Sequence, residues 1–183
     1  MAKISQQEFL TSLEDEISRQ LNFAKNLEDY SDEILNQKVD AKSWSVLECF
    51  EHMNLSMIVY IDQLKMINNL KPSGGLINFG IKGKFFSEGM RPKNDKIAYK
   101  MKTFKKLTPA SHLDKQVIES FINYSKWVWD FIRTHKPHDL NSIKVKTALG
   151  PLVKLNVAEA LSFVIAHNER HVWQINNVLK AIE

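Results

Sequence analysis

The sequence predicts an all-α protein in which four long helices form a four-helix bundle. Apolar residues recur every three or four positions in four separate stretches, and helix-starting signals precede several of these stretches. The 183 residues fit one domain of ordinary size, roughly 100–200 residues. A hydrophobic fraction of 44% is enough for a core and argues against disorder. We therefore expect a single domain over residues 1–183.

The four expected helices span about residues 5–29, 45–70, 109–134 and 157–181. Ser45 and Glu48 match a capping box, in which each residue satisfies an amide of the other at the start of the second helix. Pro109 suits the first position of the third helix. Asn156, with Glu159 three residues later, predicts the start of the fourth.

The second and third helices are separated by nearly forty residues, which hold five of the six glycines. This length is too great for a tight turn and suits a long crossover, so we expect the two helices to run parallel. A short helix over residues 96–107 is expected inside the crossover. Weak alternation over residues 143–155 predicts a small hairpin before the last helix.

Positive charge is concentrated in the crossover. Residues 82–106 carry nine Lys or Arg against Glu88 and Asp95, a local net charge of +7 in a chain whose formal charge is +4. Aromatic residues interleave with these cations, but no recognised nucleic-acid-binding motif is present, so we expect no nucleic-acid partner. If the crossover covers a binding site, its lysines would attract an anionic substrate.

Three further features indicate a cytoplasmic protein with no membrane contact. No segment approaches the roughly 18 consecutive apolar residues of a membrane helix. The first residues lack the apolar run of a signal peptide. Cys49 is the single cysteine, so no intramolecular disulfide can form, which favours a reducing compartment.

Three histidines are candidate metal ligands. His167 and His171 lie four residues apart, so their imidazoles emerge on one face of the fourth helix, among apolar residues. His52 lies on an apolar stripe of the second helix and would complete a three-histidine site with an open coordination position. The alternative is that these are ordinary core or surface histidines, because such a pair is a weak motif by itself. Cys49 is expected to be a small core residue rather than a fourth ligand.

We expect no second metal site from the other histidines, and the zinc-protease motif is absent. His112, His135 and His138 fall at helix ends or in loops and are expected to be surface or capping residues. Asn168 follows His167 where a zinc protease of the HExxH type would have glutamate, which excludes that class.

The sequence resembles the DinB-like (DinB/YfiT-type) superfamily. The resemblance rests on Trp44, Ser45, Glu48 and His52, on the segment IAHNERHVWQI that contains His167 and His171, and on LGPLVKLNVAEAL before it. It implies a four-helix bundle with a long crossover between helices two and three. It also implies a divalent metal ion (zinc, nickel or iron) on His52, His167 and His171, and often a homodimer.

For function, the resemblance implies a metal-dependent hydrolase or a low-molecular-weight-thiol S-transferase acting on a small molecule. The nucleophile would be a water or a thiol activated by the metal. No residue is placed well enough to be named the general base. Glu51, Trp173 and Arg170 are candidate pocket or supporting residues, although Glu51 is expected to be solvated and Arg170 to pair with an acid. The alternative is a non-catalytic, stress-related helical bundle with a structural metal or none.

Overall fold

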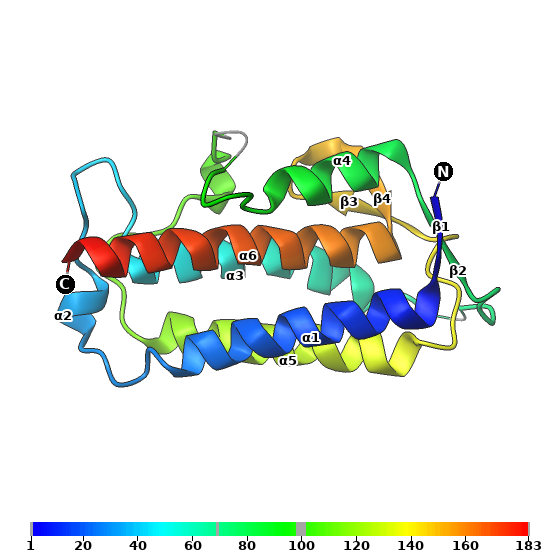
Figure 1. Ribbon diagram of the computed structural model, residues 1–183, viewed down its shortest axis with the longest axis horizontal. Coiled ribbons are helices and arrows are strands. Elements are labelled where there is room, and N and C mark those ends of the chain that lie inside the picture. Colours follow the sequence, from blue (N-terminus) through cyan, green and yellow to red (C-terminus); the bar gives the residue numbers. More distant parts are fainter. Residues whose placement is uncertain (1, 69, 98–101, 183) are drawn as a thin grey trace.

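Four long helices dominate the structure, as the predicted all-α class requires. The computed structural model describes residues 2–68, 70–97 and 102–182. The long helices lie side by side, with α3 and α5 running in one direction and α1 and α6 in the other (Figure 1). Their bounds are α1 Gln6–Lys25, α3 Val46–Leu64, α5 Gln116–His135 and α6 Val157–Ile182. A one-turn helix, α2 (Asp32–Leu35), lies between α1 and α3.

The starts of α3 and α6 agree with the sequence-based prediction. The Ser45 hydroxyl accepts a hydrogen bond from the Glu48 amide, and the Glu48 carboxylate accepts one from the Ser45 amide. The same exchange joins Asn156 and Glu159 at the start of α6. Both pairs are buried, so they satisfy amides that water cannot reach. They therefore fix where each helix that carries a site histidine begins.

Three predicted boundaries were wrong. The helix α1 ends at Lys25 instead of about residue 29, and residues 26–29 form a turn. The helix α3 ends at Leu64 instead of continuing to about residue 70. The helix α5 begins at Gln116, seven residues after the predicted start at Pro109. The physical reason for the late start is the Asn36 side chain, which donates to the Leu113 carbonyl and accepts from the Leu113 amide. This clamp holds the preceding segment out of helical conformation.

The crossover contains a helix that the sequence analysis missed. Helix α4 (Ile81–Met90) packs along α6 (Figure 1). It follows a small antiparallel sheet of β1 (Ala2–Ser5) and β2 (Leu76–Phe79), in which Ala2 pairs with Phe79. The short helix expected over residues 96–107 reduces to a 3₁₀ turn at Lys105–Leu107; residues 98–101 lie outside the described part of the chain.

The predicted hairpin before the last helix is confirmed. Strands β3 (Lys144–Thr147) and β4 (Gly150–Asn156) pair antiparallel, with Lys144 opposite Asn156. Its turn is possible because Gly150 adopts a φ of 126°, which disfavours a side chain.

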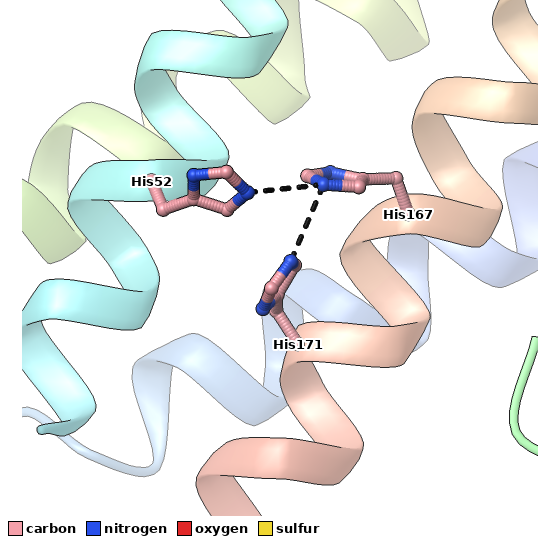
Figure 2. A group of neighbouring side chains, drawn as sticks. All are labelled: His52, His167 and His171. Carbon is pink, nitrogen blue, oxygen red and sulfur yellow. Dashed lines mark hydrogen bonds between the residues drawn. The ribbon is translucent and has the colours of Figure 1, made fainter. Parts of the chain in front are cut away.

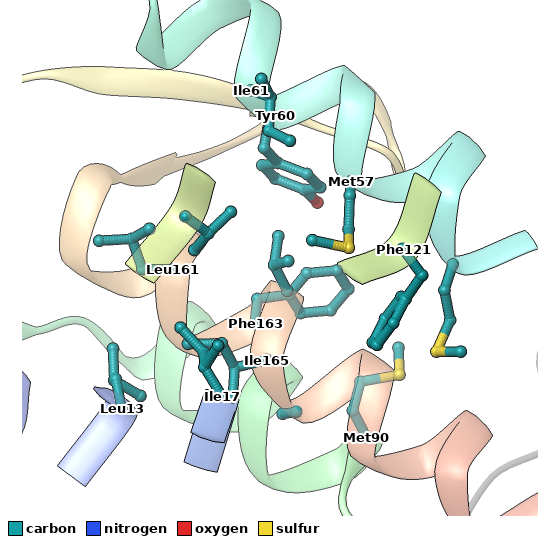
Figure 3. Close-up of a cluster of buried hydrophobic side chains, with 14 of the residues drawn as sticks. Leu13, Ile17, Met57, Tyr60, Ile61, Met90, Phe121, Leu161, Phe163 and Ile165 are labelled. Carbon is teal, nitrogen blue, oxygen red and sulfur yellow. The ribbon is translucent and has the colours of Figure 1, made fainter. Parts of the chain in front are cut away.

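The core fills the space between the long helices and α4. Figure 3 shows side chains from α1, α3, α5, α6 and α4 meeting there; the labelled set is Leu13, Ile17, Met57, Tyr60, Ile61, Met90, Phe121, Leu161, Phe163 and Ile165. Cys49 is fully buried in this core, and burial raises the pKa of its thiol, which agrees with its predicted structural role. Among the described residues, no helix has both the length and the apolar character needed to cross a bilayer.

Candidate metal centre

The structure brings His52, His167 and His171 together between α3 and α6. Their rings point toward one another (Figure 2). The Nε2 atom of His167 lies 3.2 Å from Nε2 of His52 and 3.2 Å from Nε2 of His171. One ligand atom from each ring falls within 4.8 Å of the others. His52 and His167 are 115 positions apart in the sequence. Their ring nitrogens and that of His171 nevertheless converge on one point.

Two hydrogen bonds set the orientation of the outer rings. His52 Nδ1 donates to the Leu107 carbonyl oxygen at 2.7 Å, and His171 Nδ1 donates to Gln174 Oε1 at 3.1 Å. A carbonyl oxygen only accepts, so the proton of each neutral ring lies on Nδ1 and the lone pair of Nε2 faces the centre. Hydrogen bonds of this kind orient metal-binding histidines and fix their tautomer.

Neither of these two partners was predicted from the sequence. Gln174 lies three residues after His171, a spacing that could have indicated it. Leu107 acts through its backbone, and only the path of the crossover brings it beside His52.

Burial keeps the three imidazoles neutral. Their exposed fractions are 5% for His52, 9% for His167 and 6% for His171. Desolvation lowers the pKa of all three, and the neighbouring rings and the Arg170 guanidinium lower the pKa of His171 further. The pKa of His167 falls from 6.5 to about 3. Neutral imidazole is the form that binds metal ions, so the site is set up for coordination at neutral pH.

A cavity of about 900 Å³ opens beside the three histidines. Arg170 and Trp173 line it, as the sequence analysis allowed, whereas Glu51 is half-buried on α3 and is not among its lining residues. Trp44 also lines it and packs on two of the histidines, with ring centroids 4.7 Å from His52 and 6.0 Å from His171. The cluster of nitrogen donors therefore lies in the wall of a cavity.

Comparison with known protein families accounts for this arrangement. Residues 13–175 match the family model of the DinB superfamily. The chain belongs to the DinB superfamily. No curated protein and no solved structure matches it significantly. The match confirms the resemblance seen in the sequence and covers all three histidines of this DinB-superfamily site.

The residues present fit a divalent metal ion. Two imidazole nitrogens bound to one ion at about 2.1 Å, and about 100° apart around it, lie about 3.2 Å from each other. In the DinB-superfamily site, Nε2 of His167 has this separation from Nε2 of His52 and from Nε2 of His171, and the three ligand atoms lie within 4.8 Å of one another. Among the described residues, His167 Nδ1 has no hydrogen-bond partner, so nothing there obliges the proton to sit on Nε2. All three lone pairs can therefore face one ion.

The remaining histidines of this DinB-superfamily chain lie elsewhere. His135 caps the end of α5, where its Nδ1 lies 2.8 Å from the Phe131 carbonyl oxygen. Among the described residues, the three-histidine cluster is the one group that meets the geometric requirements for holding a metal ion. His112, His135 and His138 take no part in it.

The buried histidines predict how the stability of the metal-free protein depends on pH. His167 has a pKa of about 3 when folded and near 6.5 when unfolded, so only the unfolded chain takes up a proton between these values. We expect the free energy of unfolding to be at its full value above pH 6.5 and to fall as the pH drops from 6.5 toward 3. The slope from one such histidine is at most about 1.4 kcal/mol per pH unit.

Urea denaturation of the metal-free parent and of His167→Gln at pH 7 and pH 5 checks this prediction. The variant should lose less stability than the parent between the two values, since it lacks one of the groups that titrate only on unfolding. The exposed His112, changed to Asn, serves as the control and should behave as the parent does. Equal losses in the parent and in His167→Gln would contradict the prediction.

Proposed function

We propose that this chain is a metal-dependent enzyme, built as a single four-helix-bundle domain over residues 1–183, that acts on a small molecule. One observation carries the proposal: three neutral imidazole nitrogens converge in the wall of a cavity large enough for a substrate. His52, His167 and His171 would hold the ion, and zinc, nickel and iron all suit such a nitrogen donor set.

The side chains and backbone around the three histidines would orient the metal-binding nitrogens and shield them from solvent. Leu107 and Gln174 fix the rings of His52 and His171, and Trp44 packs over both. When bound there, a divalent ion would act as a Lewis acid that lowers the pKa of a water or thiol and polarises an electrophile. A three-histidine set leaves positions open for such a ligand, as catalytic sites do.

Of the two reactions implied by the family, the lining of the cavity favours S-transfer from a low-molecular-weight thiol. Asp95 is the single carboxylate that lines the cavity within the described residues, and it is exposed. Hydrolysis needs activation of water, whose pKa is about 15.7, whereas a free thiol has a pKa of about 8.5. A site without a buried carboxylate base therefore suits the thiol better.

In this reaction the thiol loses its proton to solvent and the sulfur attacks an electrophilic carbon of the second substrate. A carbon–sulfur bond forms, and the leaving group departs with its bonding electron pair. Metal-dependent hydrolysis is the second candidate, retained because the same donor set could serve it. The enzyme that we propose is a cytoplasmic homodimer, as expected from the family resemblance and the single cysteine.

Elemental analysis of protein purified without a histidine tag, beside His52→Ala, tests the proposal. We expect about one metal ion per chain in the parent and little in the variant. Conjugation of cysteine to chlorodinitrobenzene and hydrolysis of nitrophenyl esters then compare the two reactions. The favoured reaction should depend on the metal and be lost in His52→Ala.

Two results would contradict the proposal. A parent that stays empty after incubation with zinc, nickel and iron would favour a non-catalytic helical bundle. A metal-loaded parent with no activity in either assay would favour a structural metal.

A further inference from the structure

The basic crossover forms part of the cavity wall. Four cationic side chains line the cavity, and they come from the loop before α3, the crossover and α6: Lys42, Lys96, Lys102 and Arg170. Asp95 is the one acid in the lining within the described residues, so the formal net charge of these groups is +3. This charge is present before any metal ion is counted, and it belongs to the same cavity as the candidate metal centre.

Two other basic residues of the crossover, Arg91 and Lys84, lie beside carboxylates. Arg91 pairs with Glu16 of α1 at 2.7 Å and also with Glu169 of α6. Lys84 lies near Glu88 at 3.8 Å. Within the described part of the chain, none of the ion pairs involves the three cavity lysines. The lysines that face the cavity therefore keep charge that the rest of the protein does not neutralise.

A tight turn holds one of these lysines at the rim. Asn94 and Asp95 have φ values of 51° and 55°, and the amides of Lys93 and Lys96 each donate to the other's carbonyl oxygen. Two successive residues with positive φ form the compact turn typical of hairpins, and Asn and Asp tolerate that conformation better than most residues. Arg91 ties the chain just before this turn to α1 and α6. The turn and the Arg91 contacts thus hold the backbone that leads into Lys96.

Apart from the three histidines and Ser56, the buried lining of the cavity is apolar. The buried lining includes Met90, Leu107, Phe163 and Val178, which carry no charge. The three lysines, by contrast, are exposed. Positive charge therefore lies on the exposed part of the lining, while the buried part combines apolar side chains with the three histidines. A neutral apolar ligand would make no use of the rim, and a small polar anion would make no use of the interior.

We propose that the substrate held beside the three histidines is an anionic small molecule with an apolar part, whose charge is bound by Lys96, Lys102 and Lys42. This inference rests on the proposed function, because the bound anion is a substrate only if the chain is an enzyme. The charge would also raise the rate of encounter with anions, an effect that salt screens.

Fluorescence titration of the metal-free protein with two dyes tests the proposal. The first is 8-anilinonaphthalene-1-sulfonate, which is anionic, and the second is N-phenyl-1-naphthylamine, which is its close neutral analogue. We expect the sulfonate to bind at least about tenfold more tightly, and its Kd to rise between about 20 and 500 mM salt. The Kd of the neutral dye should stay constant within about twofold over the same range.

Charge reversal locates the site. Lys96→Glu with Lys102→Glu should raise the Kd of the sulfonate about tenfold and change that of the neutral dye less than about twofold. Lys82→Glu with Lys106→Glu makes the same change in net charge on exposed crossover lysines that do not line the cavity, and should leave both dyes unaffected. The milder pair Lys96→Gln with Lys102→Gln should shift the sulfonate about threefold and covers the case in which the glutamates prevent folding.

Equal binding of the two dyes, or equal effects of the cavity and control pairs, would overturn the inference. Metal analysis of the same preparations separates it from the proposed function. If the protein prefers the sulfonate but takes up no metal, the anion site is supported and the proposal of a metal-dependent enzyme is contradicted. If the protein binds metal but does not prefer the anion, only the inference of an anion site is contradicted.

Discussion

Protein that carries His167→Ala is expected to lose its metal ion almost completely. His167 is the central histidine of the cluster, because its Nε2 lies 3.2 Å from the corresponding atom of both other rings. Removing it leaves two nitrogens on different helices and admits water to a site that is otherwise buried. Loss of a direct ligand should weaken binding by more than the roughly 10–100-fold that loss of an orienting partner causes.

A graded series of variants makes this prediction sharper. Gln174→Ala removes only the hydrogen bond that orients His171, and should weaken metal binding about 10–100-fold. His112→Asn removes an exposed histidine outside the cluster, and asparagine tolerates the positive φ of 57° at that position. Metal affinity measured by competition with a chelator should fall in the order His112→Asn, Gln174→Ala, His167→Ala. An affinity of His167→Ala close to that of the parent would exclude the three-histidine site.

Replacing Gly83 with alanine should destabilise the fold by about 2 kcal/mol. A Cβ atom at Gly83 would lie 2.5 Å from the Cγ, Cδ and Oε1 atoms of Glu159. That side chain cannot simply move away, since its carboxylate is buried and accepts hydrogen bonds from the amides of Gly80 and Asn156, at 2.7 and 2.9 Å. The strain and the weakened bonds outweigh the gain of about 1 kcal/mol from replacing glycine within a helix.

Thermal unfolding measures this effect, and the expected fall in Tm is about 4–8 °C. Gly74→Ala is the matched control, because a Cβ atom there meets nothing within 4 Å, and its Tm should remain close to that of the parent. A Tm of Gly83→Ala within about 1 °C of the parent's would contradict the prediction, because it would show that the Glu159 side chain can move away at little cost. The prediction bears on the site because Glu159 caps α6, the helix that carries His167 and His171.

Local signals in the sequence were sufficient for much of the fold. The starts of α3 and α6 are determined by residues three positions apart, Ser45 with Glu48 and Asn156 with Glu159, so no distant contact is needed to predict them. The hairpin before α6 was predictable for the same reason. By contrast, the start of α5 depends on Asn36, which is 77 residues from Leu113, and no local pattern reports that contact.

Helix α4 shows why the crossover was harder to predict. Its glycines read as helix breakers, yet Gly83 is required because Glu159 of α6 occupies the space where a side chain would stand. The need for glycine arises from a neighbour 76 positions away, and only the packed structure reveals it.

By itself, the sequence determined the mainly helical class, the family and the three histidines, because helical periodicity, capping pairs and a spacing of four residues are local properties of the chain. Only the tertiary structure decided that the histidines meet, that Leu107 and Gln174 orient them, and that the crossover lysines line the cavity. These features depend on contacts between segments far apart in sequence, whose geometry is set by how the helices pack around one core.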